Sequence, residues 1–126
     1  EDALRRDFTM NSLFYNLHTQ QIEDLTGCGL QDLQDGLVRT PLDPSVTFTD
    51  DPLRMLRAIR FSSRFNYRLH ESIREVSIKP EIHDALRLKV SKERQLKEIT
   101  GCFNGPLCRP ILAITTLYEL NLFHVV

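Results

Sequence analysis

The chain has 126 residues, of which 41% are apolar, so it can bury one ordinary hydrophobic core and is neither disordered nor fibrous. Its net charge of −1 hides an uneven distribution, because residues 1–51 are rich in acids whereas residues 54–74 are strongly basic, which favours an anionic partner. No stretch approaches the roughly 18 consecutive apolar residues of a membrane helix, so we expect no membrane partner.

Three cysteines, Cys28, Cys102 and Cys108, lack the spacing of a metal site and leave one thiol without a pair. This odd number favours a reducing compartment, which the cytoplasm, the nucleus and the mitochondrion all provide. The chain begins with Glu1 rather than Met, and no signal-peptide pattern is visible. We therefore expect an internal segment of a longer protein, with any targeting segment outside it.

The first part of the chain reads as mixed structure. Residues 2–5 predict a helical turn, and residues 14–25 alternate loosely around a polar centre, which predicts a short antiparallel hairpin. Glycines mark a tight turn within residues 27–36, and residues 37–39 could return as a strand. The two prolines in residues 41–49 predict a linker or an extended crossover.

From residue 49 onward the signals are helical. Asp50 or Asp51 is a suitable cap, and Pro52 suits the first helical position because its missing N–H would have no partner there. Further helices are expected at residues 70–78, 80–88, 91–103 and 106–122.

The helix after Pro52 is rich in arginine. Residues 50–70 contain no lysine and five arginines, namely Arg54, Arg57, Arg60, Arg64 and Arg68. At 100° per residue, Arg57, Arg60 and Arg64 lie within about 60° of one another, while the apolar residues occupy a separate arc. One face therefore predicts packing, and the other predicts a cationic ridge suited to phosphates.

Asp51 and Arg54, at the start of this helix, admit two interpretations. Their spacing allows an ordinary surface ion pair worth about 0.3 kcal/mol. Alternatively, arginine only donates and an ionised aspartate only accepts, so side by side they complement the ring-nitrogen acceptor and amino donor shared by cytosine and adenine. Uracil and guanine would be repelled, because each places a carbonyl where the carboxylate would sit.

Four motifs follow one another along the chain: RRDFTMN at residues 5–11, the segment 24–39 with Asp32 and Leu33, DDPLR at residues 50–54 followed by LR and RF, and SKER at residues 91–94 with Glu98. Together they resemble the motifs of class II tRNA nucleotidyltransferases, the CCA-adding enzymes, within the tRNA nucleotidyltransferase and poly(A) polymerase family. The resemblance covers residues 1–103 and is nearest to the eukaryotic members.

The resemblance implies an α+β chain in three parts. Residues 1–48 would be the carboxyl-terminal part of a nucleotidyltransferase head with short antiparallel strands, and residues 49–68 a neck helix that carries the base-selecting motif. Residues 69–126 would begin a helical, RNA-binding body. The implied activity is template-independent addition of C and A from CTP and ATP to the tRNA 3′ end.

The resemblance also assigns nucleotide-binding residues. Arg6 would bind the incoming nucleotide, and Asp51 and Arg54 would read its base. Arg57 and Arg60 would contact the nucleotide from the same helix.

Other matched positions have supporting roles in the family. Asp7 and Asn11 would take part in ribose recognition, and residues 24–39 would be the flexible element that lets the base-reading pair reorient between C and A. The helix at residues 91–98 would support the site without performing chemistry.

The resemblance implies Mg ions, which phosphoryl transfer of this type requires. The family's metal-binding aspartates precede the RRD motif, so we expect them outside this chain and expect no catalytic or metal-binding residue within it. Asp50 with Asp51, and Asp32 with Asp35, are other candidate carboxylate pairs, but helix capping and solvated turns account for them better. Alone, the chain should be inactive.

Two alternatives remain open. A bacterial-type poly(A) polymerase has closely similar motifs and would use ATP almost alone. A non-catalytic RNA-binding helical module would use the arginine ridge only for phosphates, with steep salt dependence and no preference among nucleotides.

Overall fold

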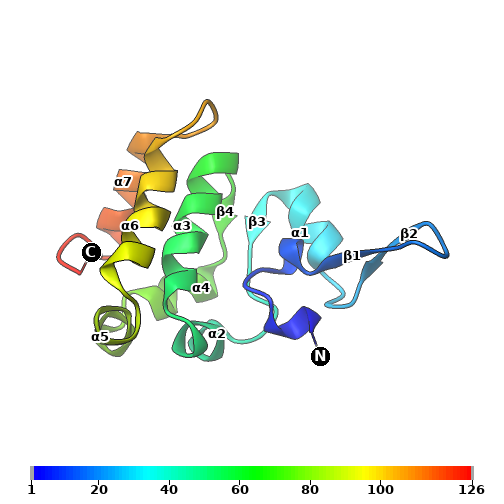
Figure 1. The fold of residues 1–126 in the computed structure, drawn as a ribbon, viewed down its shortest axis with the longest axis horizontal. Coiled ribbons are helices and arrows are strands. Elements are labelled where there is room, and N and C mark those ends of the chain that lie inside the picture. The colour runs from blue at the N-terminus through cyan, green and yellow to red at the C-terminus, as the bar shows by residue number, and fades with distance from the viewer. Residues whose placement is uncertain (1, 126) are drawn as a thin grey trace.

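The structure, a computed structural model, describes residues 2–125. A mixed amino-terminal part and a helical carboxyl-terminal part lie on either side of one central helix, α3 (Leu53–Phe65) (Figure 1). Short strands followed by helices confirm the predicted α+β class. Within residues 2–125, no helix is both long enough and apolar enough to cross a membrane.

The amino-terminal strands form the predicted hairpin. Two short 3₁₀ helices precede it, η1 (Ala3–Arg5) and η2 (Thr9–Asn11), of which η1 confirms the predicted first turn. Strand β1 (Leu13–Asn16) pairs antiparallel with β2 (Gln21–Asp24). The hairpin projects from the end of the molecule farthest from the carboxyl-terminal helices (Figure 1).

A short helix and a parallel strand pair connect the hairpin to the centre. Helix α1 (Gly29–Asp35) ends at Gly36, whose φ of +67° is a conformation that glycine adopts without strain. Strand β3 (Leu37–Val38), at the predicted position, pairs in parallel with β4 (Arg68–Leu69). Because β4 follows α3, this pair ties together segments from both sides of the central helix.

The linker predicted at residues 41–49 is wrong, because helix α2 (Pro44–Asp50) forms there. The Asp43 carboxylate accepts from the Ser45 backbone N–H at 2.8 Å, and Pro44 occupies the first turn, where its missing N–H costs nothing. Phe48 is fully buried and anchors the helix to the core. The prolines therefore marked a helix start rather than an extended crossover.

Helix α3 packs as its periodicity predicts. Met55, Leu56 and Ile59 are each at most 2% exposed, whereas the arginines lie on the partly exposed face. The helix contacts α6 (Lys92–Phe103) and α7 (Pro110–Glu119) on one side and α2 on another. It ends at Asn66, which has a φ of +57°. Side chains on α3 can therefore reach both parts of the molecule.

The remaining predicted helices are present: α4 (Glu71–Ser77), α5 (Pro80–Lys89), α6 and α7. Ser91 caps α6, since its hydroxyl accepts from the Arg94 backbone N–H at 3.3 Å. The last helix is shorter than predicted, beginning at Pro110 instead of Pro106. Gly105 has a φ of +103°, which is outside helical geometry, and residues 104–109 form no helix.

Candidate functional site

A cavity of about 470 Å³ opens where η1, the α2–α3 junction and α6 meet. Its lining is almost entirely charged: Arg5, Arg6, Asp7, Asp51, Leu53, Arg54, Arg57, Arg94, Lys97 and Glu98. Six cations face three carboxylates, an excess of three positive charges. Clefts of this kind attract anions.

The cavity gathers most of the residues predicted from the sequence. Arg6, Asp7, Asp51, Arg54 and Arg57 all line it, although they come from separate segments of the chain. The two other predicted residues, Arg60 and Asn11, do not line it. Five predicted residues therefore line the cavity, and the other two lie outside its lining.

Asp7 and Arg57, which both line the cavity, form an ion pair. The Arg57 Nε donates to Asp7 Oδ2 at 2.8 Å, and its Nη2 lies 2.7 Å from the same oxygen. Asp7 Oδ1 accepts from the Phe8 backbone N–H at 2.8 Å and from Asn11 Nδ2 at 3.1 Å. Asn11 thus touches the cavity only through Asp7. A carboxylate that is 8% exposed requires such partners.

Glu98 holds the arginines of α3 from the opposite helix. It is 5% exposed, with Oε1 3.5 Å from Arg57 Nη1 and Oε2 3.0 Å from Arg60 Nη1. Arg60 also lies over the Phe61 ring, 5.2 Å from its centroid. Arg60 therefore points toward α6 and does not line the cavity. The contact between Arg60 and the nucleotide that the resemblance implies stays a prediction.

Gly101 makes room for this arrangement. A Cβ at residue 101 would lie 2.9 Å from Arg60 Cδ, closer than side chains tolerate. Helix α6 continues through Gly101 to Phe103. The glycine serves the close approach of α3 and α6 rather than helix termination.

Asp51 and Arg54 share the cavity but have different partners. Arg54 Nη2 donates to the Arg5 carbonyl at 2.9 Å, and its Nη1 lies 3.4 Å from Asp50 Oδ2. Asp51 Oδ2 instead accepts from Arg94 Nη2 at 3.2 Å. The surface ion pair that helical spacing allowed between Asp51 and Arg54 is thus replaced by pairs with Asp50 and Arg94. Both base-reading candidates are anchored by groups outside α3.

Three cavity cations were absent from the predicted site: Arg5, Arg94 and Lys97. Arg94 and Lys97 are three residues apart on α6, which places them on one face of that helix. The sequence does show this spacing, because Arg94 ends the SKER motif and Lys97 follows three residues later. It does not show that the face is turned toward α3, because that depends on how the two helices pack.

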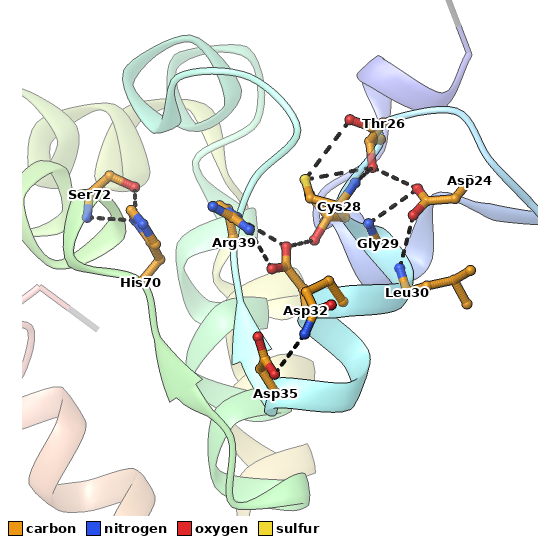
Figure 2. A network of polar contacts seen from close by, with 12 residues as sticks. Asp24, Thr26, Cys28, Gly29, Leu30, Asp32, Asp35, Arg39, His70 and Ser72 are labelled. Carbon is orange, nitrogen blue, oxygen red and sulfur yellow. Dashed lines mark hydrogen bonds and ion pairs between the residues drawn. The ribbon is translucent and has the colours of Figure 1, made fainter.

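A second polar network holds α1 (Figure 2). Asp32 is 1% exposed; it accepts from Arg39 Nε at 3.0 Å and from the Thr9 hydroxyl. This hydrogen bond from Arg39 to Asp32 raises the pKa of the guanidinium. The expectation that Asp32 lies on a solvated turn is therefore wrong, since burial and ion pairing hold it in place.

Asp24 caps the start of α1. Its carboxylate accepts from the backbone N–H groups of Leu30 at 3.0 Å and Gly29 at 3.1 Å (Figure 2). The Leu30 N–H in particular holds the pKa of the Asp24 carboxyl below its ordinary value. This contact was not predicted, because the capping residue lies five and six positions before the groups it caps.

The residues present do not fit an Mg site. Among residues 2–125, no three histidine, cysteine, aspartate or glutamate side chains gather where they could hold a metal ion. Two of the three carboxylates that line the cavity, Asp7 and Glu98, are paired with Arg57. We therefore assign no step in this chain to a metal.

Comparison with known proteins relates the site to a family. The model of the poly A polymerase head domain matches residues 1–39. Over all 126 residues, the chain is 47% identical to the mitochondrial CCA tRNA nucleotidyltransferase of Saccharomyces cerevisiae. The chain belongs to the tRNA nucleotidyltransferase and poly(A) polymerase family. It spans 23% of the length of that yeast relative.

Both branches of this family are represented among the matches. The crystal structure of the Bacillus stearothermophilus CCA-adding enzyme in complex with CTP superposes on the whole chain with a TM-score of 0.87 and 29% identity. This chain covers 30% of that enzyme. Poly(A) polymerase I of Salmonella typhi is 48% identical over 69 residues, which is 55% of this chain and 15% of the polymerase.

Proposed function

We propose that this chain supplies nucleotide binding and base selection in a template-independent tRNA nucleotidyltransferase, which adds C and A from CTP and ATP to the tRNA 3′ end. The observation that carries the proposal is one cationic cavity that contains both Asp51 and Arg54. Similarity to the yeast and Bacillus enzymes along the whole chain supports it.

Base selection follows from hydrogen-bond inventory. The Asp51 carboxylate accepts from the exocyclic amino group of cytosine or adenine, and the Arg54 guanidinium donates to the adjacent ring nitrogen. Uracil and guanine present a carbonyl to the carboxylate, so two acceptors would face each other. Arg6 and Arg57 contribute positive charge toward the triphosphate. Asp7 and Asn11, joined by a hydrogen bond beside them, would recognise the ribose.

The proposal keeps a three-part division of the chain. Residues 1–48 belong to the head, residues 49–68 form the neck that selects the base, and residues 69–126 begin the RNA-binding body. Arg60 contributes to nucleotide binding from behind the cavity, through the Glu98 that it shares with Arg57. The Mg ions that the family's chemistry requires would be held by residues outside this chain.

A reducing compartment fits the thiols. Cys28, Cys102 and Cys108 are free cysteines, and burial raises the pKa of the Cys102 thiol, which makes it less reactive. The yeast relative is named as a mitochondrial protein. We propose the cytoplasm, nucleus or mitochondrion for this protein, without a preference among them.

The test of base selection is Asp51→Asn in the full-length protein that carries this chain. The asparagine amide can donate to a carbonyl, so we expect discrimination of CTP against UTP and of ATP against GTP to fall by about ten- to hundredfold. The measurement is kcat/KM for each triphosphate with a tRNA primer.

Asp84→Asn is the matched control, because Asp84 is an exposed aspartate on α5 paired with Arg87 at 2.8 Å. Its discrimination should equal that of the wild type. Unchanged discrimination in Asp51→Asn would remove the basis of the proposal.

The match to poly(A) polymerase I supports a second candidate function, that of a polymerase that uses ATP almost alone. Incorporation of CTP by the full-length protein separates the two enzymes. The other alternative is a non-catalytic module that binds RNA phosphates. For such a module, CTP and ATP should displace bound RNA no better than UTP and GTP do.

A further inference from the structure

The Asp51 carboxylate is held at both of its oxygens. Oδ1 accepts from the Leu53 backbone N–H at 3.2 Å, at the start of its own helix. Oδ2 accepts from Arg94 Nη2 at 3.2 Å, across 43 residues of sequence. A carboxylate tethered through one oxygen can rotate about its side-chain bonds, whereas contacts at both oxygens set the direction in which it faces.

We propose that Arg94 is a positioning residue for base selection: it fixes the carboxylate of Asp51 in the orientation that accepts an amino group. This inference rests on the proposed role of Asp51. An ionised carboxylate has about four acceptor positions, and the two contacts occupy two of them. The remaining lone pairs are available to cytosine or adenine.

The backbone of Arg94 is itself held in place. Its backbone N–H donates to the capping hydroxyl of Ser91. One turn later, the buried Glu98 ties α6 to Arg57 and Arg60 of α3. Arg94 therefore reaches Asp51 from a helix whose distance from α3 is set by buried contacts.

Arg54 is anchored from a different direction. Its Nη2 donates to the Arg5 carbonyl of η1 at 2.9 Å, and its Nη1 donates to the Thr47 carbonyl of α2 at 3.3 Å. The acceptor edge is thus set by α6 and the donor edge by η1 and α2. The spacing between the two edges, and with it the shape of base that fits, depends on the packing of all these elements.

The decisive variant is Arg94→Met in the full-length protein, which removes the guanidinium but keeps a long side chain. We expect the ratio of kcat/KM for CTP over UTP, and for ATP over GTP, to fall about tenfold, the effect of about one hydrogen bond to a charged group. Because Arg94 is 52% exposed at its side chain, the thermal unfolding midpoint should stay at the wild-type value. Arg94→Lys, which keeps a donor, should restore part of the ratio.

Arg87→Met is the matched control, because Arg87 is a surface arginine paired with Asp84 on α5, outside the cavity. It should keep the wild-type ratios. The positioning role is wrong if Arg94→Met leaves the ratios unchanged, or if it lowers kcat/KM for all four triphosphates equally. If Arg94→Met does not fold, the ratios of Arg94→Lys decide, and wild-type ratios there would overturn the proposal.

Asp51→Asn, measured in parallel, separates the two proposals. If Asp51→Asn alters the ratios and Arg94→Met does not, only the positioning role fails. If neither variant alters them, base selection by Asp51 fails as well.

Discussion

At the residue scale, Arg57 is the side chain that connects the two sides of the cavity. Its guanidinium lies between Asp7 from the amino-terminal part and Glu98 from α6. Both carboxylates are nearly buried, and removing one partner of a buried pair leaves the other charge poorly compensated. Arg57 can thus hold its position before any nucleotide arrives, which lowers the ordering cost of binding.

This argument predicts the effect of Glu98→Gln on stability. The amide keeps the shape of the side chain but not its charge, so Arg57 and Arg60 lose a shared counter-charge. We expect the free energy of unfolding to fall by about 2 kcal/mol, below the 3–5 kcal/mol of a fully buried pair because both arginines are partly exposed. Urea unfolding of the 126-residue chain, followed by circular dichroism, measures this change.

Glu119→Gln is the control for that prediction. Glu119 pairs with Arg74 at 2.8 Å, but both side chains are more than 40% exposed. The loss should stay below about 0.5 kcal/mol. Equal losses in the two variants would show that burial of Glu98 has no energetic consequence.

At the element scale, two short helices owe their starts to aspartates. Asp43 caps α2, and the Ser45 hydroxyl and N–H that donate to it lower the pKa of its carboxyl. Asp24 does the same for α1 from the end of β2. A helix of seven residues has little stability of its own, so these contacts and tertiary packing decide whether it forms.

We predict that Asp24→Ala lowers the free energy of unfolding by about 1 kcal/mol at pH 7, the usual cost of losing a cap. The folded state lowers the pKa of Asp24, so the stabilisation is complete above the unfolded pKa of about 3.9 and is lost as pH falls through the folded value. The gap between wild type and variant should therefore narrow as pH falls below about 3.9 and close once pH is below the folded pKa of Asp24. Urea unfolding at a series of pH values measures it.

Asp35→Ala tests the position dependence of this effect. Asp35 is exposed at the other end of α1, where a carboxylate is not favoured by the helix dipole. Its replacement should cost nothing at pH 7. A loss as large as that of Asp24→Ala would contradict the capping explanation.

At the scale of the whole molecule, α3 connects the amino-terminal part to the carboxyl-terminal helices. It packs against α6 and α7 on one side (Figure 1). Two of its arginines contact the amino-terminal part: Arg54 donates to the Arg5 carbonyl, and Arg57 pairs with Asp7. The parallel pairing of β3 with β4 joins the segment before α3 to the segment after it. The residues that line the cavity come from both the amino-terminal and the helical part, so the cavity exists only when both are in place.

We expect the 126-residue chain alone to incorporate neither CTP nor ATP into tRNA. Phosphoryl transfer of this type needs carboxylates that hold metal ions, and the side chains of residues 2–125 form no such group. A radiolabelled-nucleotide incorporation assay with Mg²⁺ tests this, with the full-length protein as the positive control. Robust Mg-dependent incorporation by the chain alone would prove the expectation wrong.

The sequence predicted the hairpin, α3 and the helices after it because these depend on local signals: alternation, caps and a 3.6-residue period. It missed α2, where two prolines were taken for a linker although Asp43 and Pro44 together form a helix start. It also did not show that Arg60 pairs with Glu98 of α6, since spacing along a helix gives a direction but not the partner that faces it.

The amino-acid sequence by itself determined the family, the α+β class and the position of Asp51 and Arg54 at the start of an arginine-rich helix. Only the tertiary structure decided the long-range partners of the charged groups in and around the cavity. Arg94, Glu98 and Asp7 lie about 40 to 50 residues from the groups they bind, so no local pattern could pair them. Such contacts depend on the distance and rotation at which helices pack, and those are set by the buried core as a whole.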